Sequence, residues 1–404
     1  MDNIWETICK ETACDNSYEK GYLMLSDTPV IYFNFPDGVI SILEENLIPY
    51  GLRGKFDNST GMFDIRQSID YLYKFRDWLS RRVISISIGN YKQLSTYFQI
   101  AQNDGLIYKS DIALKCRAIS IEDAYWVKYE NEDKKWEEVS PYKNHFEDIV
   151  NIALSESIPG VTGDLSNPNI SIHGTFRKAL KRDNNGGSGL ILMKMGKTPD
   201  DVNAKVEWLT SRLAKFVSTL EFSQVEYLSH EIEVDDRDRF ITVCDSYYVE
   251  GYSVVSAFDM YQYLGKEGFR DWIHSSELLL TNFANMIVWD YLMANTDRHL
   301  DNYAYYMSNA TGEIIDVVPL YDMNYSFISD ICGKSINDCL CQALNDGRSI
   351  KKVVYEYAKY SNILIKDREG FLSKINSEMP EILSNGFLLE RISYLESLGC
   401  NIFG

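Results

Sequence analysis

The sequence lacks the features that mark several large protein classes. Its eight cysteines include no Cys-x-x-Cys pair, which argues against a disulfide framework or a zinc site. Its first residues carry neither the basic stretch nor the apolar segment of a secretory signal. The most apolar run, residues 278–294, is interrupted by Asn282, Asn285 and Asp290 and falls short of the about 20 apolar residues of a membrane span. We therefore expect a cytoplasmic protein with reduced thiols and no membrane segment.

The sequence also has fewer basic residues than acidic ones. Forty Lys and Arg residues stand against 59 Asp and Glu residues, for a formal net charge of −19. This excess opposes binding to phosphate backbones and to anionic lipid surfaces. We therefore expect no direct nucleic-acid partner and no membrane partner. The 45% hydrophobic and 25% charged residues are typical of a globular protein.

Patterning along the 404 residues predicts an α+β protein in three parts. Residues 1–145 mix strand-like segments, such as RRVISISIG at residues 81–89, with a helical pattern at residues 65–80, and their role is unknown. Residues 146–252 alternate strand, hairpin, strand, helix and strand, which predicts a small sheet lobe. Residues 253–404 are mostly helical and predict a second, helical lobe.

Within the expected sheet lobe, a glycine-rich cluster at residues 183–189 lies between two β-like runs. Asn-Gly beside Gly-Ser-Gly is typical of a hairpin turn. The cluster lacks the Gly-Lys-Ser/Thr ending of a phosphate-binding loop, so we interpret it as a hairpin turn. The apolar spacing of residues 206–220 predicts a helix after this hairpin.

The most informative segment is NTDRHLDN, residues 295–302, which directly follows the apolar run. Asp297 and Asn302 have the spacing to place one group on a hydroxyl proton and the other on a metal ion. Phosphoryl transfer requires such a base, together with hard oxygen ligands for Mg²⁺. Asp322, which ends the segment PLYD, would supply a further metal ligand. Asp316, within the preceding strand-like run, is the alternative.

A cation for substrate phosphates is expected from the sheet lobe. Lys194 lies in LILMKMG, among apolar neighbours where a buried lysine needs a specific reason. Glu207, in the following helical pattern, could pair with Lys194 and hold it in place. The alternative is an edge-strand lysine that points to solvent.

These motifs resemble the HipA-like kinase family, bacterial relatives of eukaryotic protein kinases that include toxins of toxin–antitoxin systems. The resemblance covers roughly residues 165–325, in the stretches NTDRHLDN, PLYD, SIHGTFRKA, LMKMG and EWLTSRLAKF. It implies a two-lobed, protein-kinase-like fold. It also implies an ATP- and Mg²⁺-dependent serine/threonine kinase that acts on a protein substrate, with a toxin role, regulation by autophosphorylation and an antitoxin partner as further implications.

The resemblance also implies roles for the individual catalytic residues. Asp297 would be the general base, with His299 beside it at a position where ordinary protein kinases often have lysine. Asn302 and Asp322 would bind Mg²⁺, and Lys194 would contact the nucleotide phosphates.

A separate set of roles falls on the stretch SIHGTFRKA. Gly174 would mark the phosphate loop, with Lys178 at its end. Ser171 lies where the family carries an inhibitory autophosphorylation serine, and Thr175 is the alternative acceptor. Both hydroxyl residues could instead be ordinary strand residues.

Simpler interpretations remain open at this point. Asp297 and Asn302 could cap a helix or stabilise a turn. His299 could bind a metal ion together with Asp297 and Asp301. The chain could also be a kinase-fold module that binds nucleotide or a partner without transfer, or a kinase of a small molecule or a phosphoinositide.

Overall fold

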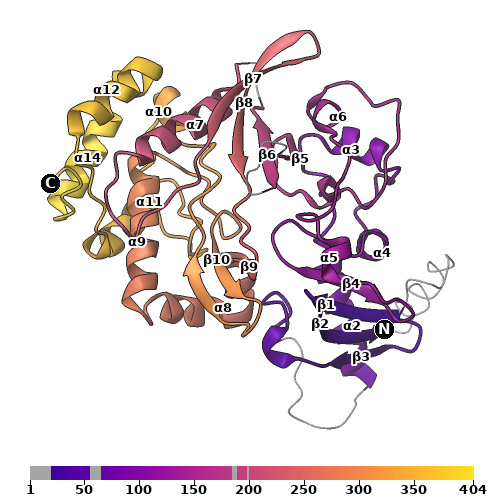
Figure 1. Cartoon of the computed structure of the whole chain (residues 1–404). Helices are drawn as coiled ribbons and strands as arrows, with labels where there is room; N and C mark the ends of the chain where they lie inside the picture. Colours follow the sequence, from indigo (N-terminus) through magenta and orange to yellow (C-terminus); the bar gives the residue numbers. More distant parts are fainter. Residues whose placement is uncertain (1–19, 55–64, 184–188, 198–199) are drawn as a thin grey trace. The chain divides into compact units, whose positions relative to one another are not determined.

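The computed structural model describes residues 20–54, 65–183, 189–197 and 200–404, which form a mixed α and β fold (Figure 1). The chain divides into two compact units. Unit 1 comprises Met1–Ile191, Tyr248–Ser253 and Met307–Ile314, and unit 2 comprises Leu192–Tyr247, Val254–Tyr306 and Ile315–Gly404. The expected mixture of helices and strands is confirmed. The two-lobed arrangement and the three-part division remain predictions.

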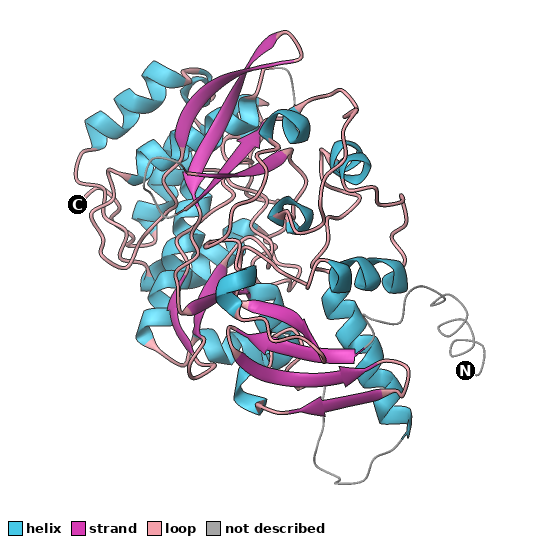
Figure 2. Ribbon diagram, turned by 45° about the vertical axis from the view of Figure 1, so that its right-hand side comes forward, coloured by secondary structure: helices cyan, strands magenta, loops and turns pink. Residues whose placement is uncertain are grey.

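Unit 1 contains an antiparallel four-stranded sheet in the order β3-β2-β1-β4 (Figure 2). Its strands are β1 (Lys20–Leu25), β2 (Thr28–Asn34), β3 (Val39–Ile42) and β4 (Tyr125–Tyr129). Helix α2 (Ile65–Ser80) spans the residues predicted to be helical. The ring of Phe75 on α2 lies 5.4 Å from the ring of Phe33 on β2. The periodic apolar face of α2 therefore packs on this sheet.

Residues 81–89 form turns, so the strand predicted there is wrong. Val83, Ile84 and Ile88 are buried without a strand partner, whereas Ile86 is 47% exposed. The Ile84 N–H donates to the Ile170 carbonyl. Arg82 is held by Asp123 through two hydrogen bonds of 2.7 Å. Side-chain and loop hydrogen bonds thus replace the strand ladder that the alternation predicts.

The rest of unit 1 consists of short elements. They are η2 (Glu45–Leu47), α3 (Tyr91–Tyr97), α4 (Leu106–Lys115), α5 (Trp136–Val139), α6 (Val150–Leu154), η3 (Pro168–Ser171) and β5 (Lys178–Arg182). The predicted hairpin follows β5. The Asp183 N–H donates to the Gly189 carbonyl at 3.2 Å, while the turn residues 184–188 lie outside the described residues.

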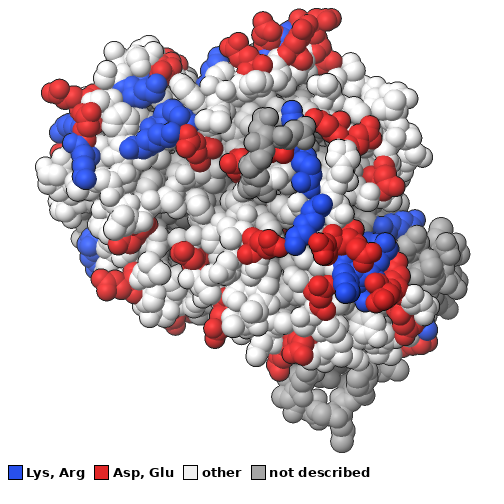
Figure 3. Space-filling model, viewed as in Figure 1, with Lys and Arg blue, Asp and Glu red and all other residues white. Residues whose placement is uncertain are grey.

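Three strands that lie mostly in unit 2 are hydrogen-bonded in the order β6-β8-β7. They are β6 (Leu190–Met195), β8 (Arg237–Asp245) and β7 (Leu228–Val234). The β7–β8 turn places Asp235 and Asp236 at φ +50° and +61°. Aspartate tolerates this left-handed backbone better than most residues, so the Asp-Asp pair suits a two-residue hairpin. Figure 3 shows acidic side chains gathered at the tip of this hairpin.

Helix α7 (Val202–Ala214) precedes β7 and carries Glu207. The helix predicted at residues 206–220 thus begins earlier and ends earlier than expected. After Ala214 the backbone leaves the helix because Val217 forms a β-bridge with Ile365 and the Ser218 N–H donates to the Leu364 carbonyl.

Unit 2 also contains the buried helix α9 (Glu277–Leu292), and the remaining elements lie wholly or partly in this unit. They are β9 (Tyr252–Ser256), α8 (Ala257–Ile273), β10 (Ala304–Ser308), β11 (Ile314–Val317), α10 (Ile328–Ile331), α11 (Ile350–Tyr357), η4 (Ala358–Tyr360), α12 (Arg368–Glu378), α13 (Glu381–Ser384) and α14 (Phe387–Ser397). Strands β11, β10 and β9 pair in that order. Every α9 residue from Phe283 to Leu292 is buried, which confirms a core helix. In the described part of the chain, no helix is both long and apolar enough to cross a bilayer.

Candidate active site

The segment NTDRHLDN leaves the end of α9 as a loop that a buried ion pair holds. Arg298 donates to both carboxylate oxygens of Asp290 on α9, at 2.8 and 3.0 Å. Asn295 donates to the same carboxylate at 2.8 Å. Arg298 also donates to the carbonyls of Asn302 and Tyr321, the latter at 2.7 Å. One guanidinium therefore ties together the core helix, the Asn302 end of the loop and the segment that leads to Asp322.

The Arg298 guanidinium of this ion pair stays charged. Burial lowers the pKa of the Arg298 guanidinium, but the adjacent Asp290 carboxylate more than offsets the effect, so the pKa is raised. Both side chains are at most 7% exposed. Asp290 and Arg298 were not identified as site residues from the sequence. The signal was the acidic residue inside the apolar run, which a buried helix tolerates only when it is paired.

Asp297 lies in this loop with its side chain half-buried. Burial raises the pKa of its carboxyl above the ordinary value; His299 opposes the shift, and the Asp322 carboxylate adds to it. Among the described residues, no donor is hydrogen-bonded to the Asp297 carboxylate, so neither helix capping nor a turn accounts for this side chain. His299 is partly exposed, and its Nδ1 accepts from the Asp301 N–H at 3.2 Å.

Asn302 is turned toward the same loop. Its side-chain nitrogen donates to the Asp297 carbonyl at 2.7 Å. This bond uses the amide N–H, so the amide oxygen is the group that a cation could take. Mg²⁺ accepts such neutral oxygens beside one or two carboxylates and substrate phosphates. Asn302 and Asp322 together fit this donor set.

Lys194, on β6, is buried between two carboxylates. Its ammonium lies 2.8 Å from Glu207 Oε1 and 2.9 Å from Asp322 Oδ1, and the residue is 4% exposed. The pairing with Glu207 expected from the sequence is therefore present, and the edge-strand alternative is wrong. Burial lowers the pKa of Lys194, but Asp322 and Glu207 outweigh it, so the pKa is raised and the ammonium stays charged. Thr242 donates to Glu207 Oε2 at 2.9 Å and fixes the carboxylate.

Asp322 adopts a left-handed backbone, with φ +58°. Such a conformation is uncommon for a non-glycine residue and clusters at functional sites. Its Oδ1 accepts from Lys194 and also from the Asn324 side chain, at 2.6 Å. The alternative metal ligand, Asp316, lies exposed on β11 and accepts from the Val317 N–H. Asp322 is therefore the acid that lies beside Lys194.

Apolar and aromatic side chains adjoin this charged group within unit 2. The rings of Tyr247 and Tyr321 are stacked, with centroids 5.1 Å apart and planes at 13°. Both contact a buried cluster. Its members are Val225, Tyr227 and Cys244, with Leu192 packed against them. The Tyr227 ring centroid is 5.3 Å from the Lys194 ammonium.

The stretch SIHGTFRKA belongs to unit 1 and is described within it. Gly174 has φ +109°, and a Cβ there would lie 2.3 Å from Lys178 Nζ, so the lysine folds back over the glycine. Lys178 donates to the His173 carbonyl at 2.9 Å. Burial, aided by Arg82 and other cations, lowers the pKa of His173 to about 4. This histidine is therefore neutral near pH 7.

Ser171 ends the short helix η3 and is 1% exposed. Its hydroxyl donates to the Pro168 carbonyl at 2.9 Å, whereas Thr175 is exposed. Neither residue lies in a strand. The proposed phosphate on Ser171 would therefore require this segment to unfold locally.

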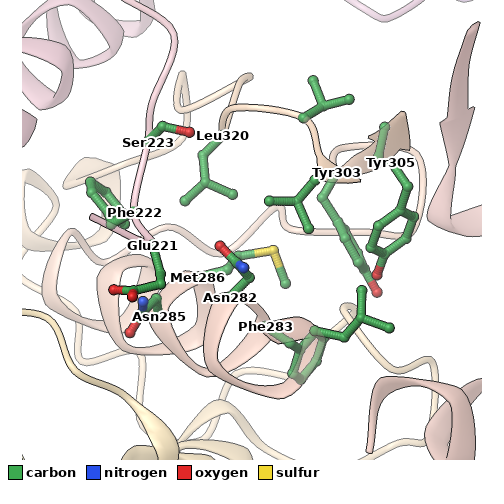
Figure 4. Close-up of a pocket in the computed structure, with 14 residues that line it drawn as sticks. Glu221, Phe222, Ser223, Asn282, Phe283, Asn285, Met286, Tyr303, Tyr305 and Leu320 are labelled. Carbon is green, nitrogen blue, oxygen red and sulfur yellow. The ribbon is translucent and has the colours of Figure 1, made fainter. Parts of the chain in front are cut away.

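The metal site that would use His299, Asp297 and Asp301 is not formed. Across the described residues, no group of three or more His, Cys, Asp or Glu side chains is arranged to hold a metal ion. A separate pocket of about 450 Å³, partly open to solvent, lies in unit 2 (Figure 4). Figure 4 shows its aromatic and apolar walls, and the described residues that line it include none of the predicted site residues.

No protein-family model matches the sequence, and no curated protein matches it. Several solved structures are similar to it, and two are described here. The proinflammatory kinase CtkA of Helicobacter pylori is 16% identical, with a TM-score of 0.42, and the match covers 57% of this chain and 91% of that one. HipA, from a complex of the toxin–antitoxin system HipA, HipB and operator DNA of Shewanella oneidensis MR-1, is 14% identical, with a TM-score of 0.47, and the match covers 94% and 99%.

Both TM-scores are below 0.5, so the function is argued below from the residues of this chain alone.

Proposed function

We propose that this chain is an ATP- and Mg²⁺-dependent kinase that phosphorylates serine or threonine hydroxyls of a protein. The observation that carries the proposal is the buried Lys194 ammonium, which contacts both Glu207 and Asp322. In this proposal Lys194 is the cation that contacts the phosphates, and Asp322 is the acid that holds the metal ion. Phosphoryl transfer requires both groups, with a base to orient the nucleophile.

Nucleotide binding would use three features of unit 2. Lys194, held charged by its two carboxylates, would contact the phosphates. The stacked Tyr247 and Tyr321 and their apolar neighbours offer a surface for the base. Asn302 and Asp322 would hold Mg²⁺, which neutralises charge on the triphosphate when it is bound.

Asp297 would then orient the substrate hydroxyl and accept its proton. The hydroxyl oxygen forms a bond to the γ-phosphorus, the bond from that phosphorus to the β–γ bridging oxygen breaks, and ADP leaves. A carboxylate without a competing hydrogen bond is suited to this role. Its raised pKa also brings it closer to the working pH of a general base.

Substrate class and partner follow from the resemblance and are part of this proposal. A protein hydroxyl fits the serine/threonine assignment, and an antitoxin would be the cognate partner of a toxin-like kinase. Incubation with MgATP and a mixed protein substrate, followed by phosphoamino-acid analysis, tests the class. Phosphoserine or phosphothreonine supports the proposal. Phosphate found only on small molecules or lipids would show that the chain is a kinase of a small molecule or of a lipid.

Asp322→Ala is expected to weaken Mg²⁺-dependent ATP binding strongly, and Asn302→Ala less so, because the first removes a charged ligand and the second a neutral one. Calorimetric titration with ATP, with and without Mg²⁺, measures both. Asp316→Ala is the matched control, since Asp316 is exposed on β11. Magnesium dependence that is unchanged in Asp322→Ala but lost in Asp316→Ala would reverse the assignment.

We further propose that phosphorylation of Ser171 switches the kinase off. A phosphate adds about −1.5 to −2 charges at neutral pH, and the buried site of Ser171 cannot hold it. The segment around Gly174 would therefore be displaced and ATP binding lost. Peptide mapping after MgATP incubation locates the phosphate, with the exposed Thr175 as the alternative acceptor. Phosphate on neither residue, or equal ATP affinity of both protein forms, would contradict the switch.

A further inference from the structure

The first turn of α7 contains a second residue on the face that carries Glu207. Asn203 precedes Glu207 by four residues, so the two side chains lie on the same side of the helix. Asn203 is 7% exposed and Glu207 is 1% exposed. The pair therefore faces the interior of unit 2 together.

Asn203 reaches the segment that carries the metal ligand. Its side-chain nitrogen donates to the Asn324 carbonyl at 2.8 Å, and the Asn324 side chain donates to Asp322 Oδ1 at 2.6 Å. Asn324 is 3% exposed. With the Lys194 ammonium between Glu207 and Asp322, these contacts close a ring that joins the ion pair to the metal ligand.

The start of α7 is itself fixed. Arg239 on β8 donates to Asp201, with a shortest distance of 2.6 Å, and the Phe240 N–H donates to the same carboxylate at 2.9 Å. Asp201 has φ +52°. The Cα of Asp201 lies only 2.7 Å from where a Cβ on Gly196 would be. These contacts with β8 fix the position of the N-terminal end of α7, where Asn203 lies.

We propose that Asn203 and Asn324 are positioning residues that set the orientation of Asp322 relative to the Lys194–Glu207 pair, an inference that rests on the proposed kinase function. Asp322 has a left-handed backbone, which needs surrounding contacts to persist. The Asn324 side chain holds its carboxylate, and Asn203 holds the backbone of Asn324. Loss of either bond would let the carboxylate turn away from the metal position.

Asn203→Asp tests this most sharply. The substitution keeps the shape of the side chain, and an acid near a helix N-terminus favours the helix, so α7 is expected to remain. The carboxylate, however, has no N–H to donate and repels the Asn324 carbonyl. Loss of a hydrogen bond that orients a metal ligand lowers metal affinity by about 10–100-fold. We expect the Mg²⁺ concentration for half-maximal ATP binding to rise by that factor, with the midpoint of thermal unfolding little changed.

Three further variants complete the experiment. Asn282→Asp is the matched control, because Asn282 also donates its side-chain amide to a backbone carbonyl, that of Leu278, but is remote from the ring. Asn203→Ala removes the donor without adding charge, and serves if the aspartate variant does not fold. Asn203→Ala combined with Asp322→Ala is expected to show no greater loss of magnesium dependence than Asp322→Ala alone, because Asn203 acts through Asp322.

The outcomes separate this inference from the proposed function. Weaker magnesium dependence in both Asn203 variants, but not in Asn282→Asp, supports the positioning role. Wild-type magnesium dependence in both Asn203 variants would overturn the positioning role and leave the kinase proposal standing. A wild-type protein whose ATP binding does not depend on Mg²⁺ would overturn the proposed function, and the positioning role with it.

Discussion

Asp297→Asn is expected to lower phosphoryl transfer by about 10²–10⁴-fold, the usual contribution of a general base, while ATP binding stays close to wild type. The amide cannot accept the substrate proton, but Asp297 is not among the residues proposed to hold the nucleotide. Single-turnover transfer and calorimetric ATP affinity separate the two effects. Asp301→Asn, an exposed acid of the same loop, is the control and is expected to retain transfer. Near-native transfer by Asp297→Asn would show that Asp297 is not the general base.

The pH dependence of transfer provides a second check on Asp297. The ionised carboxylate is the active form, and burial raises its pKa. Transfer should therefore be lost as the pH falls through this raised pKa, at a higher pH than for an ordinary aspartate. The Asp297→Asn variant should lack this acidic limb in its residual activity. An acidic limb that persists in the variant would belong to another group.

Arg298→Met is expected to destabilise unit 2 by about 3–5 kcal/mol, because it leaves the buried Asp290 carboxylate without its partner. It should also abolish transfer, since the loop loses its tie to α9. The urea midpoint of the full chain measures stability. Arg368→Met is the control: Arg368 and Glu396 are 3.7 Å apart and both well exposed, so its loss should cost about 0–1 kcal/mol.

The double variant Arg298→Met, Asp290→Asn distinguishes a lost ion pair from a general packing defect. Removing both charges leaves no uncompensated buried carboxylate, so part of the lost stability should return. A double variant that is less stable than Arg298→Met would contradict the account of this ion pair.

The sequence predicted those parts of the site in which a charged or polar residue stands beside a run of apolar residues. Lys194 among apolar neighbours required a partner, and its ion pair with Glu207 is present. The apolar run before NTDRHLDN indicated a buried helix, and α9 is buried. In each case the information lay within one segment of the chain.

Contacts between distant segments were not predictable in this way. Asn203 and Asn324 are ordinary amides in the sequence, and their role depends on a hydrogen bond that spans 121 residues. The alternation of residues 81–89 was misleading because Arg82 finds its partner, Asp123, far along the chain. The alternation of apolar residues does not show what the backbone groups bond to, and Ile86, within the same alternation, is exposed.

Intact-mass spectrometry of the purified chain after incubation with MgATP tests the central claim most directly. The account predicts a mass gain of one or more phosphoryl groups that requires Mg²⁺, is blocked by a chelator, and is absent from Asp297→Asn. If the chain gains no phosphate itself, an added protein substrate should gain it under the same conditions. Absence of transfer to either, from a protein that binds ATP with Mg²⁺, would contradict the kinase assignment and leave a nucleotide-binding module.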